Sequence, residues 1–148
     1  MSELSELLDR FGKGGEVLDS AAAGVQDFDA AAPGKWTARQ ILAHVADAEV
    51  VWAMRFRQLI AEDNPTMAGW DQDKWTTNLD YARRDPQQSL ATFRQIRGEN
   101  RALLEGIRDE DLERSGTHTL RGTKTLGEFL KLATDHVESH AKQIREMS

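Results

Sequence analysis

The chain has 148 residues, of which 39% are hydrophobic and 30% are charged, which is enough apolar material for a packed domain. Its 25 acidic and 19 basic residues give a formal net charge of −6, which disfavours binding to the phosphate backbone of a nucleic acid. Cysteine is absent, which excludes disulfides, a thiol nucleophile and thiolate metal ligands.

The N-terminus lacks the basic region and apolar run of a signal peptide. No stretch approaches the roughly 20 apolar residues that span a membrane. We therefore expect a single domain over residues 1–148, located in the cytoplasm and without membrane contact.

The first predicted helix covers residues 2–23, where apolar residues recur mostly at helical spacing. Gly12 and Gly14 weaken its middle, so we expect a distortion there. A connector that contains Pro33 and Gly34 prevents the helix from continuing.

A second helix begins at Thr37, because Thr37 and Gln40 have the spacing of a capping box. Its apolar stripe runs from Ile41 to Leu59 in steps of three and four residues. His44 lies on the flank of this stripe.

Residues 62–85 show no sustained periodicity and carry a polar and aromatic mixture that includes Trp70. A connector this long is often functional or spans the length of a bundle. Trp70 either covers a site or closes the end of the bundle. Asp85 followed by Pro86 is a good helix start, and a third apolar stripe follows up to Ile107.

Asn100 is the polar exception on the third stripe, and we expect it to form hydrogen bonds between helices. Residues 109–124 form a polar connector in which His118 is expected to be a solvated loop residue. A second capping box, Thr125 with Glu128, opens a fourth helix that continues to Met147.

Four amphipathic helices with no credible strand pair predict an all-α four-helix bundle. The long connector after the second helix permits a crossover instead of a simple up-and-down path. The residue pattern alone leaves both connection orders open.

Three of the four histidines lie on or beside core-facing stripes. His136 and His140 are four residues apart and therefore project from one helix face, and His44 can meet them if the second and fourth helices are neighbours. Three imidazoles can bind one divalent ion and leave positions open for water or substrate. The zinc protease motif is excluded, because Val137 stands where that motif has glutamate and Glu138 should point to solvent.

Gln40, Asp47 and Gln143 each lie about one helical turn from a predicted ligand, and could orient the imidazoles. The alternative is that they are solvated groups at the edge of a helix. The pattern identifies no general acid or base, so the catalytic residues stay unknown.

Two segments, KWTARQILAHVADAE at 35–49 and DHVESHAKQI at 135–144, resemble the DinB/YfiT-like superfamily. The resemblance implies a four-helix bundle with an atypical connection order. It also implies a divalent metal, nickel or zinc, bound by His44, His136 and His140. Characterised relatives include transferases and isomerases that use low-molecular-weight thiols such as bacillithiol, mycothiol or glutathione.

The main functional hypothesis is a transferase or isomerase that activates such a thiol as co-substrate at the metal, since the chain supplies no thiol of its own. A metal-dependent hydrolase uses the same ligands and is the first alternative. A bundle without catalysis, acting as a binding or stress protein, is the second. We expect a small-molecule substrate and a homodimer, the commonest oligomer.

Overall fold

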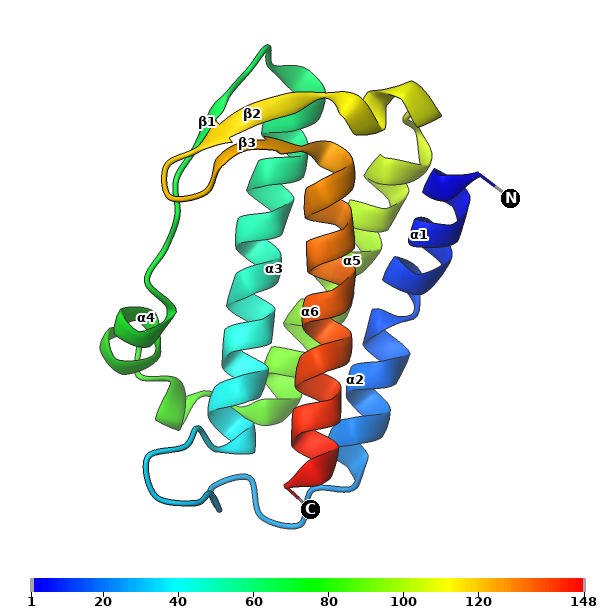
Figure 1. Cartoon of the computed structure of the whole chain (residues 1–148). Coiled ribbons are helices and arrows are strands. Elements are labelled where there is room, and N and C mark those ends of the chain that lie inside the picture. Colours follow the sequence, from blue (N-terminus) through cyan, green and yellow to red (C-terminus); the bar gives the residue numbers. More distant parts are fainter. Residues whose placement is uncertain (1, 148) are drawn as a thin grey trace.

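Four helical segments pack side by side in the computed structural model of the chain, which describes residues 2–147 (Figure 1). The first segment consists of two consecutive helices, and the other three are single helices. These helices are α1 (Glu3–Gly12), α2 (Gly14–Ala23), α3 (Ala38–Ala61), α5 (Pro86–Glu105) and α6 (Leu126–Glu146). The connections contain β1 (Thr66–Met67), α4 (Gln72–Asn78), η1 (Tyr81–Arg83), η2 (Asp109–Glu113), β2 (Ser115–His118) and β3 (Gly122–Thr125).

The predicted helix starts are confirmed by their caps. The backbone N–H of Gln40 donates to Thr37 Oγ1 at 3.1 Å, and the backbone N–H of Thr37 donates to Gln40 Oε1 at 2.9 Å. Thr125 caps α6 in the same reciprocal way. Asp85 caps α5, with Pro86 at the first helical position, where its missing N–H leaves no bond unmade.

The helices follow an atypical order of directions. In Figure 1, α1 and α2 descend, α3 and α5 both rise, and α6 descends. Contacts join α3 to α5 and α6, and join α2 to α5 and α6. Because α3 and α5 are parallel, residues 62–85 must return along the bundle between them. The predicted mostly helical bundle with a connection other than simple up-and-down is therefore confirmed.

The expectation that no strands pair is wrong. β1 pairs in parallel with β2, and β2 pairs antiparallel with β3. This sheet lies across the ends of α3 and α6 (Figure 1). Its strands are two to four residues long, too short for an alternating pattern to show in the sequence. Gly122 has a φ of +75° at the turn between β2 and β3, a conformation that favours glycine.

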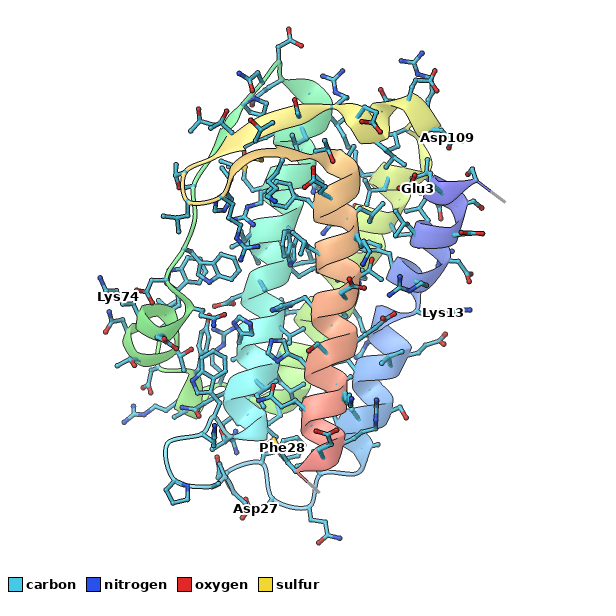
Figure 2. All side chains as sticks on the ribbon, in the orientation of Figure 1. Glu3, Lys13, Asp27, Phe28, Lys74 and Asp109 are labelled. Carbon is cyan, nitrogen blue, oxygen red and sulfur yellow. The ribbon has the colours of Figure 1, made fainter. Side chains whose placement is uncertain are left out.

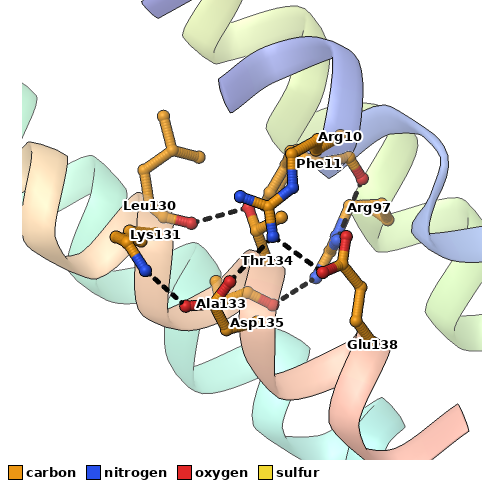
Figure 3. Close-up of polar contacts among 9 residues, drawn as sticks. All are labelled: Arg10, Phe11, Arg97, Leu130, Lys131, Ala133, Thr134, Asp135 and Glu138. Atoms are coloured by element: carbon orange, nitrogen blue, oxygen red, sulfur yellow. Dashed lines mark hydrogen bonds and ion pairs between the residues drawn. The ribbon is translucent and has the colours of Figure 1, made fainter. Parts of the chain in front are cut away.

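A buried ion pair joins all four helical segments. Arg97 of α5 donates through Nε and Nη2 to the Glu49 carboxylate of α3 at 2.8 and 2.7 Å, and both side chains are at most 4% exposed. Arg97 also donates to the carbonyls of Phe11 in α1 and Ala133 in α6, at 3.0 and 3.4 Å (Figure 3). Asn100 donates to Glu49 at 2.9 Å, which confirms its predicted role between helices.

The junction between α1 and α2 leaves room for this ion pair. A Cβ atom on Gly14 would lie 2.7 Å from Arg97 Nη1, too close for a real contact. The guanidinium carbon of Arg97 lies 3.8 Å from the centroid of the Phe11 ring, where a cation is attracted to the ring face. The distortion predicted near Gly12 is a break between the two helices at Lys13, and it admits Arg97.

The apolar stripes form two buried clusters along the bundle. One surrounds Phe56 and Phe129 near the sheet, and the other surrounds Ile41 and Phe93 toward the opposite end. Charged side chains such as Lys13 point away from the helices (Figure 2). Within residues 2–147, no helix is both long enough and apolar enough to cross a membrane.

The crossover connector is held against α3 by polar contacts. The hydroxyl of the buried Tyr81 donates to Asp47 Oδ2 at 2.7 Å, and Arg84 Nη2 donates to Asp47 Oδ1 at 3.1 Å. Within the connector, Asp71 caps α4 by accepting from two backbone N–H groups. The contacts of Tyr81 and Arg84 with Asp47 hold the end of the connector against α3.

Replacing Arg97 by methionine should destabilise the protein strongly, because the Glu49 carboxylate would stay buried without a counter-charge. We expect a loss of about 3–5 kcal/mol in the free energy of unfolding, measured by urea denaturation. Arg10→Met is the matched control, because its ion pairs with Asp135 and Glu138 join side chains that are each at least 40% exposed. Its loss should stay below about 1 kcal/mol. Equal losses in the two variants would contradict the prediction.

Candidate metal centre

The three histidines predicted as metal ligands lie together between α3 and α6. The ring centroid of His44 is 4.9 Å from those of His136 and His140, which are 4.5 Å from each other. One nitrogen of each ring lies within 4.8 Å of the other two. His44 is buried, and the other two rings are half-buried. The arrangement allows the three rings to reach one ion.

The hydrogen bonds of the rings leave lone pairs available. His44 Nε2 lies 2.9 Å from His136 Nε2, so one of these nitrogens donates a proton to the other. His140 Nδ1 donates to Gln143 Oε1 at 2.8 Å, which leaves His140 Nε2 free to accept. His136 Nδ1 is buried and has no hydrogen-bond partner among the described residues.

Burial keeps the three rings neutral. It lowers the pKa of His44 to about 4, with the neighbouring His140 adding to the effect. It lowers the pKa of His136 to about 3, reinforced by His140 and His44. Burial also lowers the pKa of His140, and the hydrogen bond to Gln143 partly opposes this. At pH 7 all three imidazoles are therefore in the form that binds a metal.

Tryptophan rings surround the histidines. The centroid of Trp36 lies 5.1 Å from that of His44, and Trp70 stacks on His44 at 6.4 Å with an interplanar angle of 23°. Trp52 lies 6.5 Å from His136. Trp70 comes from the crossover connector, so of its two predicted roles the structure favours that of covering a site.

Of the three residues predicted to orient the ligands, Gln143 contacts a histidine directly. The side-chain oxygen of Gln40 is engaged in the cap of α3, and the carboxylate of Asp47 binds Tyr81 and Arg84. Asp47 acts on His44 only through its charge, which slightly opposes the lowering of the pKa of His44. No hydrogen bond joins Gln40 or Asp47 to the three rings within residues 2–147.

The acidic neighbours of the histidine pair form ion pairs, and Asp135 also lines the cavity that opens beside His136. Glu138 accepts from Arg10 at 2.7 Å, and Asp135 accepts from Arg10 and Lys131, both at 2.8 Å (Figure 3). The expectation that Glu138 lies away from the site, with a partly exposed side chain, agrees with this geometry.

A cavity of about 340 Å³ opens beside His136. Its wall includes His136 and Ser139 of α6, Trp52 and Arg55 of α3, Trp70 of the connector, and His118 of β2. The histidine cluster therefore meets a space large enough for a small molecule.

The expectation that His118 is a solvated loop residue is wrong. It lies in β2, is 3% exposed, and places Nε2 at 3.0 Å from Nη2 of Arg55. The sequence reading missed Arg55, although a signal was present. Arg55 follows Trp52 by three residues and precedes Leu59 by four, which places it on the buried stripe of α3.

Comparison with known proteins gives relatives with a shared description. A Bacillus subtilis (strain 168) protein named "Putative metal-dependent hydrolase YfiT" is 31% identical over 116 residues, which cover 78% of this chain and 65% of YfiT. An Oceanobacillus iheyensis protein, "Putative metal-dependent hydrolase OB0782", is 26% identical over 114 residues, which cover 77% of this chain and 66% of the relative. This chain thus matches slightly less than two thirds of the length of each relative.

The fold has a close solved counterpart. The structure described as "YfiT from Bacillus subtilis is a probable metal-dependent hydrolase with an unusual four-helix bundle topology" superposes with a TM-score of 0.92 at 27% identity. The superposition covers 100% of this chain and 88% of that one. The family model described as DinB superfamily matches residues 10–144. The resemblance seen in the two histidine segments is confirmed, and the chain belongs to the DinB superfamily.

Proposed function

We propose that this chain is a metal-dependent hydrolase in which His44, His136 and His140 bind one divalent metal ion. The proposal rests on three neutral imidazole nitrogens that lie within 4.8 Å of one another, with one of the three residues, His136, lining a cavity. The names of the relatives support hydrolysis over the thiol transfer that the sequence favoured.

The residues present fit a metal ion. His44 and His136 direct ring nitrogens at each other at 2.9 Å, and an ion can take the place of the proton they share. The hydrogen bond from His140 to Gln143 fixes the tautomer that leaves Nε2 as the ligand atom. Three nitrogen donors without a thiolate suit zinc or nickel.

A divalent ion bound there supplies Lewis acidity, which polarises a carbonyl group and lowers the pKa of a water molecule. The protein contributes a fixed set of neutral rings and a covered pocket. Trp70 and Trp36 lie against His44 and limit access of bulk water from that side. Only histidines form the ligand cluster among residues 2–147, which leaves coordination positions for solvent and substrate.

Thiol transfer is the competing reaction, because the same three ligands can hold an external thiol as thiolate. The small-molecule substrate and the homodimer expected from the sequence stay predictions. Nickel and zinc stay equal candidates for the metal.

Elemental analysis of protein purified without an affinity tag should find close to one equivalent of zinc or nickel per chain. His44→Ala and His136→Ala should each lose that metal, because each removes one of only three protein ligands. His118→Asn is the matched histidine control and should keep it, since His118 lies outside the cluster. Equal metal content in all four proteins would exclude the site.

Gln143→Ala should weaken metal affinity by about 10–100-fold, because the His140 ring loses the acceptor that orients it. Gln40→Ala is the matched control. It removes half of the capping box of α3, so it should cost on the order of 1 kcal/mol in unfolding free energy without changing metal affinity. Competition with a chromogenic chelator measures the affinity. A Gln143→Ala variant with wild-type affinity would contradict the orienting role.

Metal-loaded protein should hydrolyse model substrates from a panel of nitrophenyl esters and acyl nitroanilides. His136→Ala should lose more activity than the about 10–100-fold typical for an orienting residue, because a ligand itself is removed. The same preparations should be assayed for transfer of glutathione or bacillithiol to chlorodinitrobenzene. Transfer that depends on His136, without metal-dependent hydrolysis, would replace the hydrolase proposal by the thiol transferase.

A further inference from the structure

Arg55 is a buried cation without a counter-charge. Its side chain is 4% exposed, its Nη2 donates to the carbonyl of Ala68 at 3.1 Å, and its Nε is buried with no hydrogen-bond partner among the described residues. Within residues 2–147, no carboxylate forms an ion pair with it, and the charge that acts on it is the like charge of Arg121. Burial lowers the pKa of Arg55 to about 10, so it remains charged at neutral pH. A buried charge of this kind is costly unless a partner meets it.

His118 presents a second donor at the same place. Its Nδ1 accepts from the backbone N–H groups of Leu120 and Arg121, both at 3.1 Å. An imidazole nitrogen that accepts carries no proton, so the proton of the neutral ring is on Nε2. Nε2 lies 3.0 Å from Arg55 Nη2, which can only donate. Two donors therefore face each other without an acceptor between them.

Trp52 adds a third donor. Its Nε1 is buried and lacks a partner among the described residues. Trp52, Arg55 and His118 all line the cavity that His136 also lines. The Trp52 ring centroid is 5.1 Å from the Arg55 guanidinium carbon and 6.5 Å from the His136 ring centroid. The Trp52 indole is thus a near neighbour of both the Arg55 guanidinium and the proposed metal ligand His136.

We propose that Arg55, His118 and Trp52 form a binding site for the carboxylate of a small anionic substrate. The inference deepens the proposed function. It rests on that function only in treating the bound anion as a substrate. A carboxylate accepts several hydrogen bonds at once and supplies the missing counter-charge. The apolar body of the substrate lies along Trp70 and Leu132, and its reactive group reaches His136.

A purely structural role for Arg55 leaves these donors unexplained. Its guanidinium carbon lies 5.1, 5.6 and 5.1 Å from the ring centroids of Trp52, Trp70 and Phe129, which accounts for its position. Contact with ring faces supplies no acceptor for Arg55 Nε, for Trp52 Nε1 or for the proton on His118 Nε2. In our proposal, a carboxylate bound in the cavity that these three residues line supplies the missing counter-charge and acceptors.

The test compares two ligands of nearly the same shape, 3-phenylpropionate and the neutral 3-phenylpropanamide, by isothermal titration calorimetry. The full chain is used after chelation and dialysis, so that no metal competes for the acid. The wild type should bind the acid at least about tenfold more tightly than the amide, the range of a charge-assisted hydrogen bond. Arg55→Met should bind both alike. Arg57→Met, on the same helix but bonded to Ala53 and Asn100, should keep the preference.

Two further variants each remove one donor. Trp52→Phe deletes Nε1–H, and His118→Asn can keep an acceptor for the Leu120 and Arg121 amides while deleting the imidazole Nε2–H. Each should weaken acid binding several-fold and leave amide binding unchanged. These variants decide the question if circular dichroism shows Arg55→Met to be unfolded.

His44→Ala separates this inference from the proposed function, because it removes a metal ligand and leaves the three donors in place. It should keep the preference for the acid even if every test of metal binding fails. The proposal is overturned if the wild type binds acid and amide equally or binds neither. It is also overturned if folded Arg55→Met keeps the full preference, or if both single-donor variants bind the acid as the wild type does.

Discussion

The bundle depends on the burial of one charge pair, Arg97 with Glu49. A guanidinium and a carboxylate taken out of water stabilise a fold only when nearly every donor and acceptor is met. Here the partners come from α1, α3, α5 and α6, so the four segments must pack in one relative register. Ala133, whose carbonyl accepts from Arg97, lies one turn before His136 on α6. The register that satisfies the ion pair therefore also brings His136 opposite His44.

This constraint gives the cavity two chemically different ends. At one end is His136, which lines the cavity and belongs to a cluster of three neutral imidazoles whose pKa values are lowered by burial. At the other end is Arg55, charged and without a carboxylate partner among residues 2–147. The same helix, α3, supplies His44, Trp52 and Arg55, so its straight course between the two apolar clusters sets the spacing of the ends.

Features that depend on neighbours in the chain were predictable. The capping boxes at Thr37 and Thr125 form because their partners are three residues away. His136 and His140 share a face because four residues make about one helical turn. The small sheet escaped prediction, since β1 and β2 pair across about 50 residues and are too short to show a period. His118 lies in β2 of this sheet, so its burial could not be predicted from the sequence either.

The sequence by itself determined four amphipathic helices, their starts, a family resemblance and three candidate ligands, because each follows from local spacing or short motifs. Only the tertiary structure decided the parallel course of α3 and α5, the partner of Glu49, and the burial of Arg55 beside His118. These features join residues 48 and 63 positions apart. Pairing at such a distance depends on how whole helices pack against one another. Hydrophobic periodicity shows which face of a helix is buried, but it does not show which residues pack against that face.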